Sequence, residues 1–338
     1  MIKNKIIFLL VALGLLLSCS NNPKNKYIQL EGEAQGTTFF ISYYDSLETD
    51  YSKEIEEILI DFDNQLSVYL PTSIISKFNR NKIDVIFNSE ETSHLFDCFK
   101  KSISILEYTN GNFNHGLQNL IDANRYSSYS KGIYNKEIRE SILSITSEVV
   151  INDEFITKID TQSQFNFDAI AQGLSVDVIC DFFNSKGVDN YMVEIGGEVK
   201  VNGNSSKGKL WKIALESPSS TVKERKIQET ISLNNESVVT SGSYRKFKIR
   251  DGIKYSHALN PKTGLGVIHN LLSVSVITDN CAIADGLATA FLVMGKDNTI
   301  AFLENDNTYN VKLMFIESDS LDNYTTSYYG GFENYLIK

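Results

Sequence analysis

Residues 281–294 read Cys-Ala-Ile-Ala-Asp-Gly-Leu-Ala-Thr-Ala-Phe-Leu-Val-Met and are small or apolar at nearly every position. A helix that is apolar on all sides has to be buried, so we expect the rest of the chain to pack around this segment. Asp285 and Thr289 are four residues apart and therefore lie one turn apart on the same helix face. A carboxylate and a hydroxyl in a buried position suit a hard cation such as Mg²⁺, which prefers oxygen ligands. The alternative is structural: Asp285 caps the helix and Thr289 bonds back to the helix backbone.

The composition is that of an ordinary globular protein. The chain has 338 residues, of which 42% are hydrophobic and 22% are charged, and its formal net charge is -10. This length can form a large core, as one large domain or two smaller ones. No basic stripe stands out, which argues against nucleic-acid binding.

The N-terminus has the pattern of a targeting signal. Lys3 and Lys5 precede an apolar run over residues 6–17, which has the length of a signal peptide and is too short for a comfortable membrane span. The run ends in Leu-Leu-Ser-Cys19, which resembles the lipobox of bacterial lipoproteins. We therefore expect a lipoprotein signal peptide over residues 1–18, lipidation of Cys19, a tether over residues 19–28 and a folded domain over residues 29–338. The protein would then be an extracytoplasmic lipoprotein of the bacterial cell envelope, anchored to the membrane. The alternative is a plain secretory signal with an incidental cysteine.

The other cysteines are Cys98, Cys180 and Cys281. Their number is odd, none belongs to a Cys-x-x-Cys motif, and each lies among apolar residues with helical spacing. We interpret them as small buried hydrophobic residues rather than metal ligands, with a catalytic cysteine as the minor alternative.

Hydrophobic periodicity predicts mixed helices and strands. Helices are expected over 52–65, 89–110 and 169–186, with Asp168 as N-cap and Gly187 just past the C-terminus of the last helix. One or two helical turns are expected within 111–124. Strands are expected over 37–44, 149–151, 155–157, 191–195, 198–202, 211–215, 238–241, 246–250 and 271–277. The hairpins among these strands favour a single α+β domain with largely antiparallel sheets and packed helices over a doubly wound parallel sheet.

Three further segments combine polar residues with glycine. Residues 166–173 (Asn-Phe-Asp-Ala-Ile-Ala-Gln-Gly) lead into a helix whose first turn could offer free N–H groups to a phosphate, or could simply pack closely. Residues 191–198 contain a Gly-Gly turn that lets the backbone approach a ligand, or forms a tight hairpin. Residues 239–244 and 257–264 place hydroxyl residues at the end of a strand and His257 before an Asn-Pro-Lys-Thr-Gly turn. His257 is a candidate acid, base or ligand contact, although a single histidine is more often structural.

The order of these motifs along the chain is distinctive. Gly36-Thr-Thr38, Ser67-Val-Tyr69, residues 166–173, Glu194-Ile-Gly-Gly-Glu198, Thr240-Ser-Gly242, residues 257–264 and Ala284-Asp-Gly-Leu-Ala-Thr289 follow one another. In this order they resemble the ApbE family of FAD:protein FMN transferases, and the resemblance spans residues 29–338. It implies a single α+β domain with T-fold-like halves that binds FAD and Mg²⁺. Such enzymes move FMN from FAD to a Thr or Ser hydroxyl of a target protein and release AMP. The targets are flavin-carrying subunits of membrane or extracytoplasmic redox systems.

The resemblance also implies roles for individual residues. The metal ligands would be the Ala169 carbonyl, the Asp285 carboxylate and the Thr289 hydroxyl. The FAD-binding residues would be Gln35, Tyr69, Asn112, Phe113, Asn114, Asn166, Gln172, His257 and Leu259. His257 and Asp168 are the candidates for the general base, and Asp285 would contribute to catalysis through the metal.

This chain departs from the family pattern at several positions. The family usually has Asp where Asn114, Asn166 and Asn260 stand, and often Lys or Glu where Gln172 stands. The segment after Phe113 normally reads Asp-Pro-Thr-Val-Gly-Pro-Leu-Val, and here it reads Asn-His-Gly-Leu-Gln-Asn-Leu-Ile. Asn keeps an oxygen acceptor but removes a charge. Two alternatives to FMN transfer therefore stay open: an Mg²⁺-dependent FAD pyrophosphatase that gives FMN and AMP, and a non-catalytic FAD-binding lipoprotein. A structural or adhesion lipoprotein is a more distant alternative.

Overall fold

The computed structural model describes residues 27–126, 135–220, 224–243, 247–250, 253–319 and 323–337. The predicted signal peptide and Cys19 lie outside these residues. Over the described ranges, no helix combines the length and the apolar character needed to cross a bilayer. Tyr27 and Ile28, which were expected in the tether, belong to the folded domain. The Tyr27 ring packs edge-on against Trp211, and Ile28 begins the first strand.

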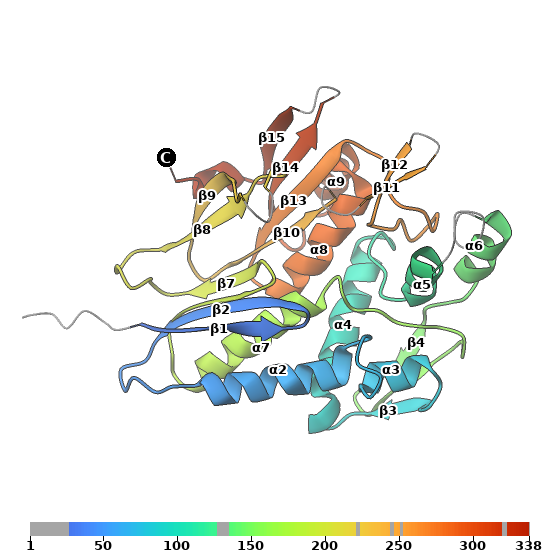
Figure 1. The fold of residues 1–338 in the computed structure, drawn as a ribbon, viewed down its shortest axis with the longest axis horizontal. Coiled ribbons are helices and arrows are strands. Elements are labelled where there is room, and N and C mark those ends of the chain that lie inside the picture. The colour runs from blue at the N-terminus through green and yellow to red at the C-terminus, as the bar shows by residue number, and fades with distance from the viewer. Residues whose placement is uncertain are drawn as a thin grey trace, which may run out of the picture.

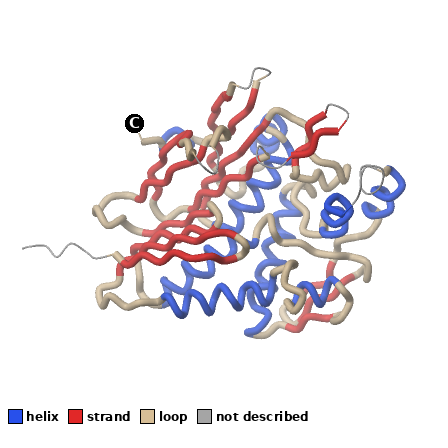
Figure 2. Tube along the Cα trace, viewed as in Figure 1, coloured by secondary structure: helices blue, strands red, loops and turns tan. Residues whose placement is uncertain are grey.

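Largely antiparallel sheets are expected from the sequence, and the centre of the fold is one eight-stranded sheet with the order β1-β2-β6-β7-β10-β13-β14-β15 (Figures 1 and 2). Every pairing in it is antiparallel, which confirms the predicted fold class. Its strands are β1 (Ile28–Ala34), β2 (Thr37–Tyr44), β6 (Asn190–Ile195), β7 (Glu198–Asn202), β10 (Ser237–Gly242), β13 (Leu271–Thr278), β14 (Lys312–Ser318) and β15 (Tyr324–Tyr329).

Helices cover one face of this sheet and a small hairpin covers part of the other. The helices α7 (Ala171–Ser185) and α8 (Cys281–Met294) pack against β6, β10 and β13. The hairpin of β8 (Trp211–Glu216) and β9 (Ile227–Leu233), together with the 3₁₀ helix η2 (Phe332–Tyr335), encloses a second apolar cluster on the opposite face. The sheet therefore has a core on each side, and the larger of the two is on the helical side.

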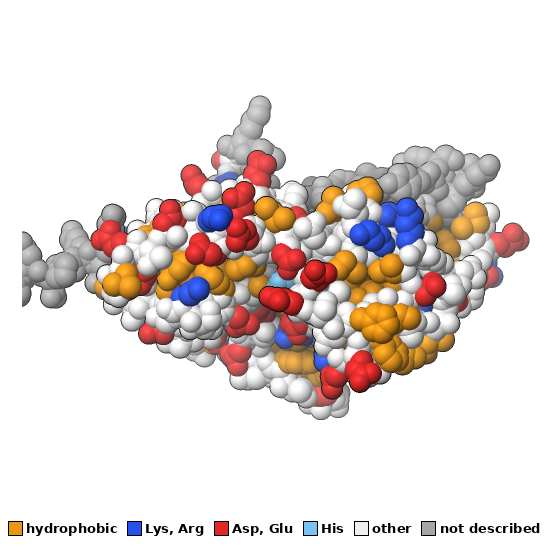
Figure 3. All heavy atoms as spheres, turned by 90° about the horizontal axis from the view of Figure 1, so that it is seen from below, with side chains coloured by type: hydrophobic (Ala, Val, Ile, Leu, Met, Phe, Trp, Pro, Cys, Tyr) orange, Lys and Arg blue, Asp and Glu red, His pale blue; other side chains and the backbone are white. Residues whose placement is uncertain are grey.

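The remaining elements lie around this centre. The helices are α2 (Ser52–Leu66), α3 (Ile74–Asn79), η1 (Glu90–Thr92), α4 (Ser93–Tyr108), α5 (Gln118–Tyr126), α6 (Lys136–Leu143) and α9 (Lys296–Asn305). Strands β3 (Val85–Phe87), β5 (Phe155–Lys158) and β4 (Val149–Ile151) form a small sheet, and β11 (Phe247–Arg250) pairs with β12 (Ile253–Ser256). Seen from below, the surface carries scattered acidic side chains and several hydrophobic patches (Figure 3).

The apolar helix α8 is the most enclosed helix among the described residues. Every residue of α8 except Thr289 and Met294 is buried, as its composition predicted. It crosses α7 closely at Gly173, because a Cβ atom there would lie 2.4 Å from the carbonyl oxygen of Cys281. Only glycine allows this approach, and it brings the start of α7 next to Asp285.

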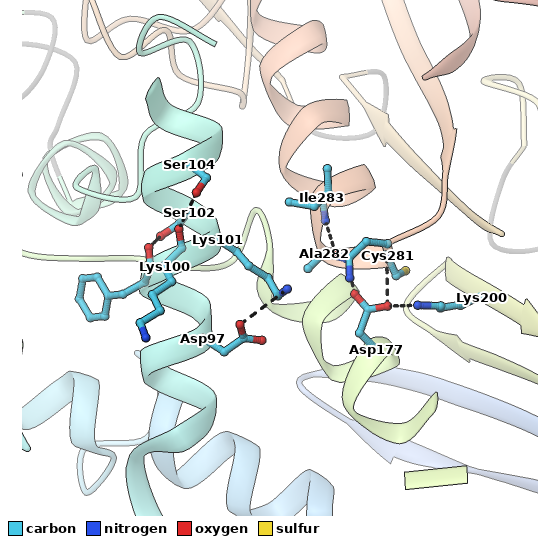
Figure 4. A network of polar contacts seen from close by, with 12 residues as sticks. Asp97, Lys100, Lys101, Ser102, Ser104, Asp177, Lys200, Cys281, Ala282 and Ile283 are labelled. Carbon is cyan, nitrogen blue, oxygen red and sulfur yellow. Dashed lines mark hydrogen bonds and ion pairs between the residues drawn. The ribbon is translucent and has the colours of Figure 1, made fainter. Parts of the chain in front are cut away.

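An ion pair fixes the N-terminus of α8 (Figure 4). The carboxylate of Asp177, on α7, accepts hydrogen bonds from the backbone N–H groups of Cys281 (3.2 Å) and Ala282 (2.9 Å) and lies 2.6 Å from the ammonium of Lys200 on β7. These N–H groups have no partner within their own helix, and a negative charge at the positive end of the helix dipole is favourable. Asp177 thus ties α7, α8 and the sheet together at one point.

Most predicted elements are present, with two corrections. The predicted helix 89–110 is interrupted, because η1 precedes α4. Asp168 is not the N-cap of α7: the helix begins after Ile170, and the Asp168 carboxylate instead accepts a hydrogen bond from the Tyr69 hydroxyl (2.7 Å). Gly187 does follow the helix with φ +73°, and all three cysteines in the described residues are buried and free.

Candidate functional site

The site is a cavity of about 660 Å³ on the helical side of the sheet, between α7, α8, the ends of β7 and β10, and the loops around residues 112–117 and 257–261. Such a volume is typical of small-molecule and cofactor sites. The predicted site residues that line it are Tyr69, Asn112, Phe113, Asn114, Asn166, Asp168, Ala169, Gln172, His257, Leu259, Asp285 and Thr289. They come from five separate stretches of the chain, and the fold brings them together.

Asp285 does not cap its own helix, α8. The side chain of Asn280 is the N-cap of α8, and Asp177 holds the first two N–H groups. Asp285 Oδ2 instead accepts a hydrogen bond from the backbone N–H of Gly173 on α7 (3.1 Å). Burial raises the pKa of Asp285, and the charge of Asp168 raises it further, against the lowering effect of this hydrogen bond. The capping interpretation of Asp285 is therefore wrong, and its carboxylate lies in the cavity.

Thr289 faces the same cavity from the next turn of α8. Its hydroxyl lies 3.3 Å from the Ser241 hydroxyl, so it contacts strand β10. Ala169, at the approach to α7, also lines the cavity. Carboxylate, hydroxyl and carbonyl oxygens form a donor set that suits a hard cation. Across the residues that the structure describes, no three His, Cys, Asp or Glu side chains gather as a metal cluster. A cation here would therefore need water or substrate oxygens to complete its coordination.

Glu198 is a charged residue of the cavity that the predicted site did not include. It begins β7, it is only 8% exposed, and its Oε2 atom is buried with no hydrogen-bond partner among the described residues. Burial, followed by the nearby charge of Asp285, raises the pKa of Glu198 well above its ordinary value. A buried carboxylate oxygen without a partner is costly, which indicates a site for a ligand or cation rather than a purely structural role. The Glu-Ile-Gly-Gly-Glu motif was visible in the sequence, but no local pattern indicated that its last residue would face Asp285.

The loops opposite α8 supply amide groups and an aromatic ring. Tyr69 is 62% exposed at the cavity and is hydrogen-bonded to Asp168. Asn166 Nδ2 donates to Gln118 Oε1 (2.8 Å), while its Oδ1 accepts from the backbone N–H of Asp168 (2.9 Å). An Asp at position 166 could accept but could not donate, so the departure from the family pattern adds a bond that orders this loop.

The other departures also have structural partners. Asn114 Oδ1 accepts from the backbone N–H of Gly116 (2.7 Å), and Asn260 Oδ1 accepts from the backbone N–H groups of Lys262 (2.9 Å) and Thr263 (3.2 Å). These bonds need only an oxygen acceptor. Asn in place of Asp therefore preserves the two turns while removing negative charge.

Two expectations about ligand contacts do not fit the structure as stated. Gln35 does not line the cavity: it lies in the β1–β2 turn with φ +53°, and both polar atoms of its side chain are buried without a hydrogen-bond partner among the described residues. The first turn of α7 is not an open anion site, because the N–H of Ala171 donates to Phe167 (2.8 Å) and that of Gly173 donates to Asp285. The cavity lining that the site prediction did not include consists of Leu117, Ile121, Asn124, Glu198, Thr240, Ser241, Gly242, Ala258, Pro261, Leu292 and Val293.

Comparison with known proteins agrees with this architecture. The model of the ApbE family matches residues 35–315. A curated relative from Vibrio cholerae, named FAD:protein FMN transferase, is 31% identical over 97% of this chain and 99% of its own length. A relative of the same name from Haemophilus influenzae is 29% identical over 90% and 91%.

Solved structures give the same result. The flavin transferase ApbE from Vibrio cholerae superposes with a TM-score of 0.77 at 29% identity, over 92% of this chain and 99% of that one. The apo form of the flavinyl transferase ApbE from Pseudomonas stutzeri superposes with a TM-score of 0.79 at 26% identity, over 92% and 96%. The chain therefore belongs to the ApbE family, and it is a transferase.

Proposed function

We propose that this chain is an Mg²⁺-dependent FAD:protein FMN transferase. It would transfer FMN from FAD to a Thr or Ser hydroxyl of a flavin-carrying acceptor protein, with AMP as the leaving group. The observation that carries the proposal is the meeting of Asp285, Thr289, Ala169 and Glu198 in one cavity of cofactor size, where Oε2 of Glu198 has no hydrogen-bond partner among the described residues. The names of the relatives support FAD as the flavin donor.

The donor set fits a magnesium ion. The Asp285 carboxylate, the Thr289 hydroxyl and the Ala169 carbonyl would hold it, and the raised pKa of Asp285 reflects a buried carboxylate that a cation would stabilise in its charged form. When bound, the ion would neutralise the diphosphate of FAD and make the bond to AMP easier to break. The rest of the catalysis would come from positioning, as is usual in phosphoryl transfer.

The protein's own residues have separable tasks in this proposal. Tyr69 offers an aromatic face for the flavin ring, and its hydroxyl is held by Asp168. The acceptor hydroxyl must lose a proton as its oxygen attacks the phosphorus. Asp168 and His257 both line the cavity as candidate bases, and the charge of Asp168 reaches Asp285. Replacing each base candidate separately (Asp168→Asn, His257→Gln) distinguishes them. Replacement of the true base should lower kcat and shift the acidic limb of the pH profile of kcat.

The proposal is tested by mass spectrometry of flavin-carrying subunits from the same organism after incubation with the protein, FAD and Mg²⁺. We expect a covalent FMN adduct with the wild type and its loss with Asp285→Ala and Thr289→Ala. Thr289→Ser should retain part of the activity because it keeps the hydroxyl. Asp181→Ala, an exposed position on α7, is the matched control.

Three outcomes would contradict the proposal. Near wild-type transfer by Asp285→Ala in limiting Mg²⁺ would refute the metal assignment. Rapid, repeated AMP release without any adduct would identify a FAD pyrophosphatase instead. Retention of FAD without AMP release over hours would identify a non-catalytic flavin-binding protein.

We also propose that the protein is a lipoprotein of the cell envelope, anchored through Cys19. The support is the charged start, the apolar run and the Leu-Leu-Ser-Cys19 sequence. Labelling cells with a radioactive fatty acid should mark the wild type and leave Cys19→Ala unlabelled. Equal labelling of both would overturn the proposal.

A further inference from the structure

A second hollow, the β8 groove, lies on the face of the main sheet opposite the helices. It has a volume of about 550 Å³ and separates the sheet from strand β8. Its lining consists of Thr37, Thr38, Phe40, Met192, Glu194, Gly196, Gly197, Val199, Lys212, Ile213, Ala214, Leu215, Glu216, Arg225, Val238 and Thr240. Five consecutive residues of β8 line it, although alternate side chains of a strand point to opposite faces. The backbone edge of β8 therefore faces the groove.

That edge carries polar backbone groups that no strand of the described residues pairs with. Strand β8 pairs with β9 alone, in a two-stranded sheet. On β9, the Thr230 carbonyl accepts a hydrogen bond from the N–H of Ile337 (2.9 Å), so the polar groups of Thr230 point away from β8. Because Thr230 stands opposite Ala214, the N–H and C=O of Ala214 point away from β9 in turn. The same alternation turns those of Lys212 outward, so both residues present a donor and an acceptor to the groove.

The β8 groove and the cavity share one lining residue, Thr240 on β10, next to the place where the pairing of β7 with β10 ends. Strands β7 and β10 pair at only two positions, Lys200 with Ser237 and Val199 with Val238. Beyond them β10 continues to Gly242, whereas the chain before β7 turns away at Gly196 and Gly197. Thr240 lines both hollows, and Glu198 lines the cavity beside it. The next residue, Ser241, contacts the proposed cation ligand Thr289 (3.3 Å between the two hydroxyls), so β10 links the groove to the cavity.

The chemistry of the proposed function requires such a second approach. In phosphoryl transfer the attacking and leaving oxygens lie roughly in line, on opposite sides of the phosphorus. FAD, including its AMP moiety, would occupy the cavity on the helical side, so the acceptor hydroxyl has to arrive from elsewhere. The groove lies on the opposite face of the sheet and borders Thr240, the neighbour of Ser241, which contacts Thr289.

We propose that the β8 groove binds the acceptor polypeptide as an extended segment that adds to the free edge of β8 and presents its Thr or Ser at Thr240. This inference rests on the proposed function. An extended polypeptide is the occupant whose N–H and C=O spacing matches those of Lys212 and Ala214. The apolar floor of Phe40 and Met192 suits alternate side chains. The wall carries charges of both signs, with Arg225 paired to Glu216 (3.3 Å), which does not favour a purely anionic ligand.

The test is steady-state FMN transfer by the Ala214→Pro variant to the acceptor subunit that carries the FMN adduct in the mass-spectrometry experiment. Proline removes the outward N–H of residue 214 and is tolerated where a strand edge is unpaired. The loss of one backbone hydrogen bond should raise the KM for the acceptor about tenfold, with kcat at saturating acceptor and the affinity for FAD unchanged. Lys212→Pro removes the other outward N–H and should also raise this KM, while Lys207→Pro, at an exposed lysine outside the groove, is the control and should not.

A second measurement does not depend on any variant. Hydrogen exchange of the amides of residues 212 and 214 in the wild type should slow when the acceptor binds. An unchanged acceptor KM in Ala214→Pro, or unprotected amides at saturating acceptor, would overturn the groove assignment while FMN transfer itself stands. The absence of any adduct with the wild-type protein would instead overturn the proposed function, and this inference with it.

Discussion

Replacing Asp177 by Ala should lower the free energy of unfolding by about 3–5 kcal/mol, which is the usual cost of breaking a buried ion pair by removing one partner. The Asp177 carboxylate has three partners in the structure: the N–H groups of Cys281 and Ala282 and the ammonium of Lys200. The Lys200 side chain is only 19% exposed. Burial by itself would lower the pKa of Lys200, but Asp177 raises it above its ordinary value, so the lysine stays charged. Without Asp177 this charge and two helix N–H groups would be buried unpaired.

The loss would be a large fraction of the unfolding free energy, which is typically about 5–15 kcal/mol for a whole domain. Urea unfolding followed by circular dichroism measures it. Asp177→Asn should cost less, because its amide oxygen can still accept a hydrogen bond from the helix. The double variant Asp177→Asn with Lys200→Met should recover part of the stability by removing the unpaired charge.

Glu56→Ala is the control here, since Glu56 lies on α2, away from the ion pair, and is exposed. A loss below about 1 kcal/mol in Asp177→Ala, the range of exposed ion pairs, would refute the reasoning. The reasoning would also be refuted if the double variant lost more unfolding free energy than the two single variants, Asp177→Asn and Lys200→Met, lose together. Because α8 carries Asp285 and Thr289, we also expect the destabilised variants to bind Mg²⁺ more weakly, as titration calorimetry would show.

Three further predictions concern other buried positions. Burial lowers the pKa of His115 to about 4. As the pH falls from 6.5 to 4, the unfolded state therefore takes up a proton first, and the free energy of unfolding drops by up to about 3 kcal/mol. His115→Leu should remove this part of the acid sensitivity in urea titrations at several pH values; the same dependence of the unfolding free energy on pH in both proteins would contradict it. Burial raises the pKa of Glu198, so the metal-free protein loses stability as the pH rises above the unfolded pKa near 4.5. In EDTA at neutral pH, Glu198→Gln should therefore melt at a higher temperature than the wild type. A lower melting temperature would argue against the burial of a charged carboxylate at this position. Gly173→Ala should lower the free energy of unfolding by about 1–3 kcal/mol because its Cβ would collide with the backbone of Cys281. Gly286→Ala should lower it less, because its Cβ would collide with the flexible end of the Ile105 side chain. A larger loss for Gly286→Ala in urea unfolding would show that α7 and α8 can separate.

Local patterns indicated much of the fold. The alternating and β-branched stretches predicted β2, β4 and β7 with the observed bounds, and helical spacing predicted α2 to within one residue. The boundaries failed where a tertiary contact decided them. Asp168 has the composition of an N-cap, but the Tyr69 hydroxyl, 99 residues away in sequence, takes its carboxylate, and α7 begins later. The strand β9 (Ile227–Leu233) was missed because only two of its residues, Ile231 and Leu233, are buried, and its single partner is the short strand β8.

The sequence by itself determined that residues 281–294 form a buried helix, because no face of that segment could remain in water. It also determined that Asp285 and Thr289 share one side of this helix, since helical geometry follows from spacing alone. Only the tertiary structure decided what stands opposite them. Glu198 reaches the cavity because a Gly-Gly turn ends the hairpin of β6 and β7 beside α8, and Gly173 lets α7 approach closely enough to donate a hydrogen bond to Asp285. Such contacts join residues about a hundred positions apart, and they depend on how the sheet and helices pack, which no local pattern records.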